Sequence, residues 1–198
     1  GRGRTLTSAY METPLALYIH WPFCVSNCPY CDFNSHVRES VNAEQWRAAL
    51  LADMAYEAAL TPGRTLGSIF FGGGTPSLMP PALVADLIAA AGAHWRLADD
   101  IEITLEANPN SVETARFADL AVAGVNRVSL GLQALDDSAL RFLGRARDVN
   151  AGLAALGTAL GTTATSLGNG RIRVDIAATP ANVSALTAWL AGQQVMVG

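Results

Sequence analysis

The three cysteines of this chain, Cys24, Cys28 and Cys31, lie within eight positions, in the stretch "CVSNCPYC". An odd number of cysteines cannot all pair with one another, and we find no export signal. We therefore expect reduced thiols and a cytoplasmic protein rather than a disulfide framework. Thiolates at the spacing C-x3-C-x2-C are close enough in the chain to bind one metal centre.

Two kinds of metal centre remain open at this point. A structural zinc ion would need a fourth ligand, for which His20 and His36 are candidates. An iron–sulfur cluster normally takes four cysteines. Three cysteines would leave one iron of a [4Fe–4S] cluster without a protein ligand. That iron would be open to a small molecule carrying an amine and a carboxylate.

Composition excludes several other classes of function. Of the 198 residues, 51% are hydrophobic and 15% are charged, as in a globular domain. The formal net charge of −4 and the absence of a basic face argue against a nucleic-acid partner. All thirteen cations are arginine, which excludes Schiff-base lysines and lysine-containing phosphate loops. We find no apolar run long enough for a membrane span.

Short β-favouring runs alternate with stretches of helical period, which predicts an α/β fold of parallel strands joined by helices. Strands are expected at 15–21, 65–71, 100–109, 126–133 and 171–178, and helices at 42–60, after Pro80–Pro81, at 111–124, 136–143, 149–160 and 181–191. The Gly/Thr-rich segment 157–170 is expected to be a loop. We expect one core domain, residues 15–198, after a flexible lead-in of residues 1–14.

The unusual residues follow the carboxyl ends of four predicted strands. The cysteines follow the first strand and "GGGTPS" follows the second. Glu106 and Asn108 close the third strand, and Gln133 closes the fourth. In parallel α/β sheets and barrels, ligands bind at this edge. The sequence therefore predicts one site built from four loops.

A family resemblance now becomes visible. The stretch "CVSNCPYC" resembles the signature of the radical S-adenosylmethionine (radical SAM) enzymes. Together with "LYIHWPFC", "FFGGGTPS", "LEANP" and "GVNRVSLGLQALDDSALRFLGRARD", it resembles the oxygen-independent coproporphyrinogen III oxidase-like branch, which includes haem chaperones. The resemblance covers residues 15–148 and implies a partial (β/α) barrel of the TIM type.

The resemblance also implies cofactors and the residues that hold them. Cys24, Cys28 and Cys31 would bind a [4Fe–4S] cluster, and one electron from it would cleave S-adenosylmethionine to methionine and a 5′-deoxyadenosyl radical. A flavodoxin or ferredoxin is the expected electron donor. The implied S-adenosylmethionine contacts are Tyr18, Tyr30, Gly73, Gly74, Thr75, Glu106, Gln133 and Arg145. His20 is either functional or a satisfied histidine at a strand end, and Asp175 matches a later family aspartate only loosely.

Phe33 separates two branches of the family. Oxidases carry a further cysteine two positions after the third ligand, where this chain has Phe33. The pattern favours a haem chaperone that binds haem and passes it to an acceptor protein, with a coproporphyrinogen III oxidase as the alternative. Residues 149–198 match the family poorly, so we expect a barrel truncated on its C-terminal side. A non-enzymatic iron–sulfur or zinc scaffold and an inactive fragment remain open as rival interpretations.

Overall fold

The structure is a computed structural model. It describes residues 13–24, 31, 34–38, 40–108, 116–131, 133–134, 136–143, 149–160, 163–168 and 171–174. The predicted contacts Tyr30 and Arg145, together with Cys28, Phe33 and Asp175, lie outside the described residues, as does the helix expected at 181–191.

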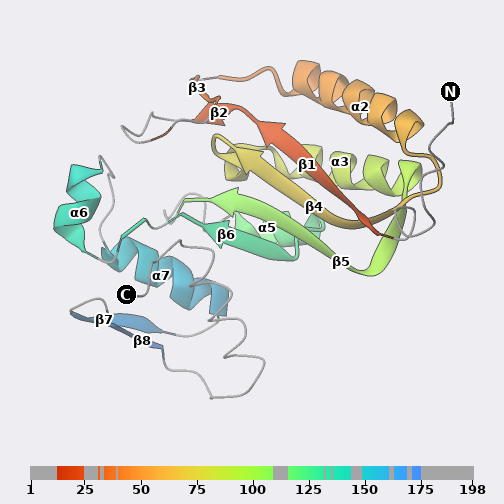
Figure 1. The fold of residues 1–198 in the computed structure, drawn as a ribbon. Coiled ribbons are helices and arrows are strands. Elements are labelled where there is room, and N and C mark those ends of the chain that lie inside the picture. Colours follow the sequence, from red (N-terminus) through yellow and green to blue (C-terminus); the bar gives the residue numbers. More distant parts are fainter. Residues whose placement is uncertain are drawn as a thin grey trace, which may run out of the picture.

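A four-stranded parallel sheet forms the centre of the molecule. Its order is β1 (Leu15–Trp21), β4 (Thr65–Gly73), β5 (Arg96–Ala107) and β6 (Arg127–Leu130). Every neighbouring pair is parallel, so the four arrowheads in Figure 1 point to the same edge. This confirms the predicted α/β class and four of the predicted strands, with shifts at their ends.

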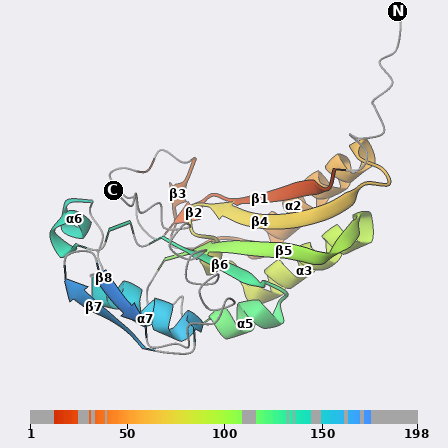
Figure 2. The ribbon, with the colours of Figure 1, turned by 60° about the horizontal axis from the view of Figure 1, so that its bottom comes forward.

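Three helices cover one face of this sheet (Figures 1 and 2). They are α2 (Ala43–Leu60), α3 (Pro81–His94) and α5 (Phe117–Val122). The Asn42 side chain caps α2 by accepting a hydrogen bond from the Gln45 N–H at 3.1 Å. Helix α3 begins at Pro81, where the missing N–H of proline costs no helical hydrogen bond.

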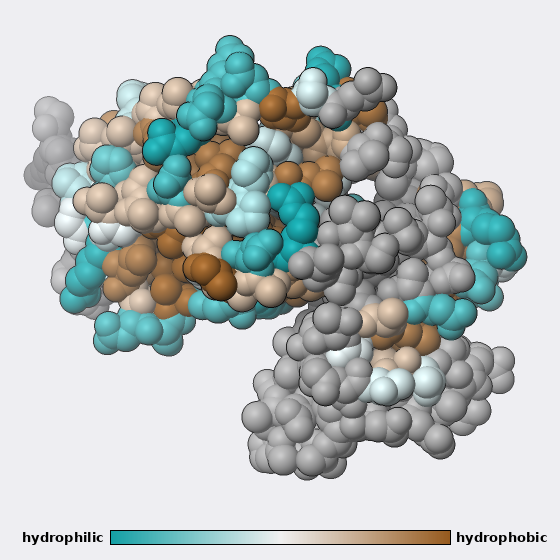
Figure 3. Space-filling view, turned by 180° about the vertical axis from the view of Figure 1, so that it is seen from behind, coloured by the Kyte–Doolittle hydropathy of each residue, from teal (hydrophilic) through white to brown (hydrophobic). Residues whose placement is uncertain are grey.

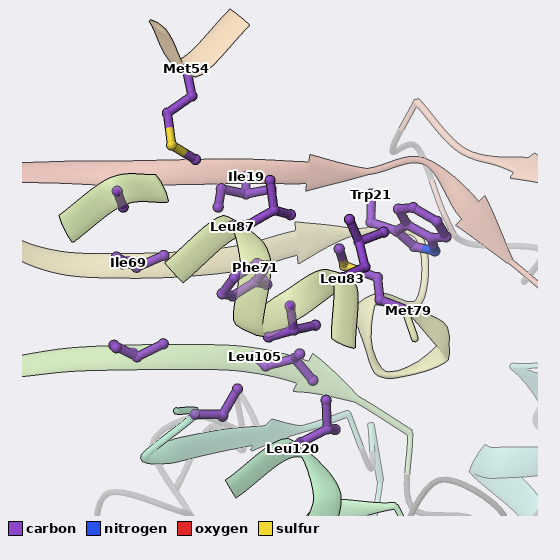
Figure 4. Packing of buried hydrophobic residues seen from close by; sticks show 14 of the residues in the cluster. Ile19, Trp21, Met54, Ile69, Phe71, Met79, Leu83, Leu87, Leu105 and Leu120 are labelled. Carbon is purple, nitrogen blue, oxygen red and sulfur yellow. The ribbon is translucent and has the colours of Figure 1, made fainter. Parts of the chain in front are cut away.

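The hydrophobic core lies between the sheet and these helices. Ile19, Phe71 and Leu105 come from three neighbouring strands and are almost fully buried. They pack against side chains of α3 such as Leu87, and Figure 4 shows the two layers meeting. Because side chains alternate along a strand, residues next to these in sequence point to the opposite face of the sheet.

The strand β5 is held to the turn before β6 by one side chain. The Asn126 amide oxygen accepts a hydrogen bond from the Ile103 N–H at 2.8 Å. The amide nitrogen of Asn126 donates to the Ile101 carbonyl at 2.8 Å. Strand β5 pairs with β6 only from Thr104 onward. The Asn126 side chain therefore supplies hydrogen-bond partners for the part of β5 that precedes this pairing.

The later part of the chain departs from the predicted pattern. Helices α6 (Asp137–Phe142) and α7 (Val149–Leu160) agree with the sequence. The expected loop at 157–170 is wrong, because it contains β7 (Ala164–Gly168). The expected fifth strand is β8 (Arg171–Val174), which pairs antiparallel with β7 in a separate two-stranded sheet. The letters "NG" at positions 169–170, between the two strands, are compatible with a hairpin turn.

Among the described residues, no helix is both long enough and apolar enough to span a bilayer. Figure 3 shows the helical side of the molecule, where hydrophilic and hydrophobic residues alternate across the part drawn in colour.

Candidate functional site

The ends of β1 and β4 are joined beyond the sheet by backbone hydrogen bonds. His20 pairs with Gly72 and Trp21 with Gly73 in the strand register. After the strands end, the Gly74 N–H donates to the Trp21 carbonyl at 2.7 Å. The Thr75 N–H likewise donates to the Phe23 carbonyl at 2.8 Å. The glycine turn, Gly72–Gly74, is thus fixed against the segment that leads into the cysteines.

Gly72 and Gly73 provide room for two side chains of β1. A Cβ atom at Gly72 would lie 2.7 Å from the Tyr18 Cε2. A Cβ atom at Gly73 would lie 2.7 Å from the His20 ring, and Gly73 has a φ of +116°, which disfavours any other residue. The Tyr18 and His20 rings therefore lie directly over the backbone of the glycine turn.

Gly74 brings this turn against the first cysteine. A Cβ atom at Gly74 would lie 2.6 Å from the Phe23 carbonyl oxygen and 2.9 Å from the Cys24 Sγ. Thr75, the next residue, is buried. The predicted cofactor contacts Gly73, Gly74 and Thr75 and the predicted cluster ligand Cys24 are therefore brought together.

The cysteine loop returns to the end of β1 through a short parallel pairing. The strands β2 (Phe23–Cys24) and β3 (His36–Val37) pair with each other. The His36 N–H donates to the Pro22 carbonyl at 2.6 Å, and the Arg38 N–H donates to the Cys24 carbonyl at 3.3 Å. Cys24 is partly buried and Cys31 is exposed, and both are free thiols. The described segments close the loop at its base, and the Cys31 thiol is exposed.

His20 has a protein partner at each ring nitrogen. Its Nε2 lies 3.0 Å from the Asn34 carbonyl oxygen, and its Nδ1 lies 3.3 Å from the Tyr18 hydroxyl. A carbonyl only accepts, so Nε2 carries the proton; in the neutral ring Nδ1 then accepts from Tyr18. A ring occupied at both nitrogens is not placed to bind a metal. This arrangement favours the satisfied strand-end histidine over a zinc ligand.

Glu106 lies at the end of β5 and reaches the glycine turn. Its Oε2 accepts a hydrogen bond from the Gly73 N–H at 3.2 Å. Burial raises the pKa of the Glu106 carboxyl, while the Gly73 N–H acts in the opposite direction. Burial, and then the negative charge of Glu106, raise the pKa of Tyr18. The carboxylate thus lies beside both the turn and the Tyr18 ring.

The Phe70 ring is a part of this site that the sequence analysis missed. It stacks on Tyr18 with ring centroids 6.0 Å apart and an interplanar angle of 16°. Phe70 lies directly opposite Tyr18 in the strand register, on the face of the sheet away from the helices. The strand alternation of "SIFFG" was the signal that could have placed it there.

Gln133 follows β6 in a left-handed conformation with a φ of +75°, which is uncommon for a residue other than glycine. Its side chain is exposed, and the hydrogen bonds of the described residues include none between Gln133 and Glu106. Such strain marks a functional candidate but does not by itself assign a role.

The donor set fits an iron–sulfur cluster in its chemistry. Cys24 and Cys31 are free cysteines, and thiolates are the ligands that such clusters take. The described residues contain no group of three or more metal-ligating side chains, since Cys28 is not among them. The cluster assignment to three cysteines therefore stays a prediction.

Comparison with known families decides the class of protein. The profile of the radical SAM superfamily matches residues 18–160. The chain belongs to the radical SAM superfamily. This match spans the cysteine loop, the glycine turn and the end of β5, so it confirms the resemblance inferred from the motifs.

Individual relatives show which members of this superfamily the chain is similar to. "Heme chaperone HemW" of Escherichia coli (strain K12) is 47% identical over 133 residues, which cover 67% of this chain and 35% of the relative. "Radical S-adenosyl methionine domain-containing protein 1, mitochondrial" of Bos taurus is 42% identical over 161 residues, covering 81% of this chain and 35% of the relative. The chain thus spans about a third of the length of these curated relatives.

A solved structure shows the same fold. The coproporphyrinogen III oxidase (HemN) from Escherichia coli, described as a radical SAM enzyme, superimposes with a TM-score of 0.67 at 31% identity. The match covers 77% of this chain and 35% of that protein. It confirms the predicted fold class, an α/β chain corresponding to part of a radical SAM fold.

Proposed function

We propose that this chain is the cofactor-binding part of a radical SAM protein that binds haem and transfers it to an acceptor protein. Cys24, Cys28 and Cys31 would hold a [4Fe–4S] cluster, with S-adenosylmethionine bound beside it. The observation that carries the cofactor part is the contact of Cys24 with the glycine turn, which Glu106 joins from β5. Three sequence segments with cofactor-type chemistry thus share one edge of the sheet.

Each residue of this edge has a separate task in the proposal. Gly73 and Gly74 have no side chains of their own, which would let the cofactor approach the backbone of the turn closely. The Glu106 carboxylate offers an acceptor next to that turn. Tyr18 and Phe70 provide an aromatic surface on the same face. When bound, the cluster supplies the single electron for reductive cleavage of S-adenosylmethionine, from a donor such as flavodoxin or ferredoxin.

The haem part of the proposal is supported by two facts. The relatives named as haem chaperones are 36–47% identical over 133–137 residues. This chain also has Phe33 where oxidases of the family carry a further cysteine. A titration of the anaerobically reconstituted chain with haem, followed by the absorption of the haem, tests it. We expect saturable binding at one haem per chain. Failure to saturate would overturn the haem assignment and leave the cofactor assignment standing.

A second function, oxygen-independent coproporphyrinogen III oxidase, is favoured by one observation, the structural match to HemN. The two proposals separate in an anaerobic assay with coproporphyrinogen III, S-adenosylmethionine and a reductant. The chaperone proposal expects no decarboxylated product. Formation of that product would make the oxidase the better-supported function and the chaperone the alternative.

A further inference from the structure

His20 contacts three parts of the proposed cofactor site. We propose that His20 is a positioning residue that holds the return segment of the cysteine loop against the glycine turn. This inference rests on the proposed cluster site, because the loop held in place is the one that carries Cys24 and Cys31.

The first step is the bond from the ring to the loop. The His20 Nε2–H donates to the Asn34 carbonyl at 3.0 Å, across fourteen positions of the chain. Asn34 lies three residues after Cys31, so the bond fixes the chain just beyond the third cysteine. The two backbone bonds at His36 and Arg38 hold only the base of the loop. His20 adds a hydrogen bond that is nearer to Cys31 along the chain.

The second step is the fixed position of the ring itself. The ring lies over Gly73, where a Cβ atom would come within 2.7 Å of both Cε1 and Nδ1. The Tyr18 hydroxyl at Nδ1 sets the ring orientation and leaves Nε2 directed at the loop. Because Gly73 also donates to Glu106, one imidazole links the loop to the turn that meets the carboxylate.

The third step is what such a link does for a metal centre. Groups that fix ligands from outside the coordination shell change metal affinity by about 10- to 100-fold when they are removed. A histidine that only stabilises a strand end would instead change the unfolding midpoint and leave metal retention alone. The two roles therefore differ in a measurable quantity.

The test compares three variants of the full chain after anaerobic reconstitution with iron and sulfide. His20→Leu removes both ring hydrogen bonds. His20→Gln keeps an amide N–H for the Asn34 carbonyl. His94→Leu is the matched control, because His94 is an exposed imidazole at the end of α3. The readouts are the rate at which a ferrous chelator removes iron and the thermal unfolding midpoint.

We expect iron release from His20→Leu to be about 10- to 100-fold faster than from wild type. His20→Gln should recover most of the difference, and His94→Leu should match wild type. If His20→Leu released iron at the same rate as the wild-type chain, the inference would be overturned. So would equally fast release from His20→Gln and His20→Leu, because it would show that the bond to Asn34 has no part in retention.

A second measurement does not depend on the stability of the variants. Nitrogen-15 NMR of the histidine rings in the wild-type chain without iron reports the tautomer, with His20→Gln used to assign the signal. The bond to Asn34 requires a proton on Nε2, and a proton on Nδ1 alone would refute it. A wild-type chain that takes up no iron would instead overturn the proposed function and the cluster part of this inference, while the ring signal still decides the bond itself.

Discussion

The Gly73 N–H donates to the Glu106 carboxylate at 3.2 Å, joining residues that are 33 positions apart in the chain. Gly73 is the last residue of β4, and Glu106 lies at the end of β5. The donor is the backbone N–H of a glycine with a φ of +116°, a conformation that disfavours other residues. The protein's own backbone therefore holds this acceptor next to the glycine turn.

Stability should depend on pH through Glu106. Burial raises its pKa in the folded state, so the unfolded chain ionises first as the pH rises. The contribution of Glu106 to folding is full below the ordinary glutamate pKa, about 4.3. It is lost as the pH rises through the raised value. We expect Glu106→Gln to be more stable than wild type near neutral pH and equal to it below the ordinary value. Urea unfolding at both pH values checks this; a variant less stable at neutral pH would contradict it.

Cofactor affinity should depend on Glu106 and not on Glu102, the glutamate four positions earlier on the same strand. We expect Glu106→Ala to retain the cluster but to bind S-adenosylmethionine about 10- to 100-fold more weakly, because a hydrogen bond to a charged group is lost. Glu102→Ala is the control, since Glu102 lies on the same strand in a partly exposed pair with Arg127. Equilibrium binding to the reconstituted chains measures both. Unchanged affinity in Glu106→Ala would refute the assigned role.

A methyl group at Gly74 should damage the site. The added Cβ would meet the Phe23 backbone at 2.6 Å and the Cys24 Sγ at 2.9 Å. We expect Gly74→Ala to lose about 1–3 kcal/mol of unfolding free energy and to retain less iron. Gly92→Ala is the control. Gly92 lies in helix α3, and a Cβ atom there would have a Leu97 methyl group as its nearest neighbour, at an ordinary contact distance of 3.5 Å. This variant should gain about 0.5–1 kcal/mol. If Gly74→Ala and Gly92→Ala changed the unfolding free energy and the iron content equally, the close contact of Gly74 with Phe23 and Cys24 would be contradicted.

The link between β5 and the turn before β6 should matter for stability alone. Asn126→Ala leaves the N–H of the buried Ile103 without its partner, and we expect a loss of about 1–3 kcal/mol. Asn126→Asp keeps the acceptor but not the donor, so it should fall between Ala and wild type. Denaturant unfolding measures the series. If Asn126→Asp lost as much unfolding free energy as Asn126→Ala, the bond to the Ile103 N–H would not be the one that stabilises the fold.

The sequence predicted the edge of the sheet well because parallel strands leave local signals. The run "LALYIHW" is a strand over its whole predicted length. Strand β4 continues two residues further than expected, through Gly72 and Gly73, because the end of β1 pairs with them. Glycine has low strand propensity, so only the partner strand reveals this.

Contacts made by backbone atoms could not be predicted in the same way. The Asn34 carbonyl that accepts from His20 carries no sequence signal, since any residue there has a carbonyl. The hairpin of β7 and β8 was missed for another reason. Threonine and glycine in that segment fit a loop as well as a strand, and the pairing partner decides between them.

The reduced cluster itself offers the most direct measurement. The chain is reconstituted with iron and sulfide without oxygen, reduced, and examined by electron paramagnetic resonance before and after adding S-adenosylmethionine. We expect the signal of a reduced [4Fe–4S] cluster that changes when the cofactor is added, and its loss in Cys24→Ala, Cys28→Ala and Cys31→Ala. Stoichiometric zinc without iron, or a cluster signal indifferent to S-adenosylmethionine, would contradict a cluster with one iron open to the cofactor.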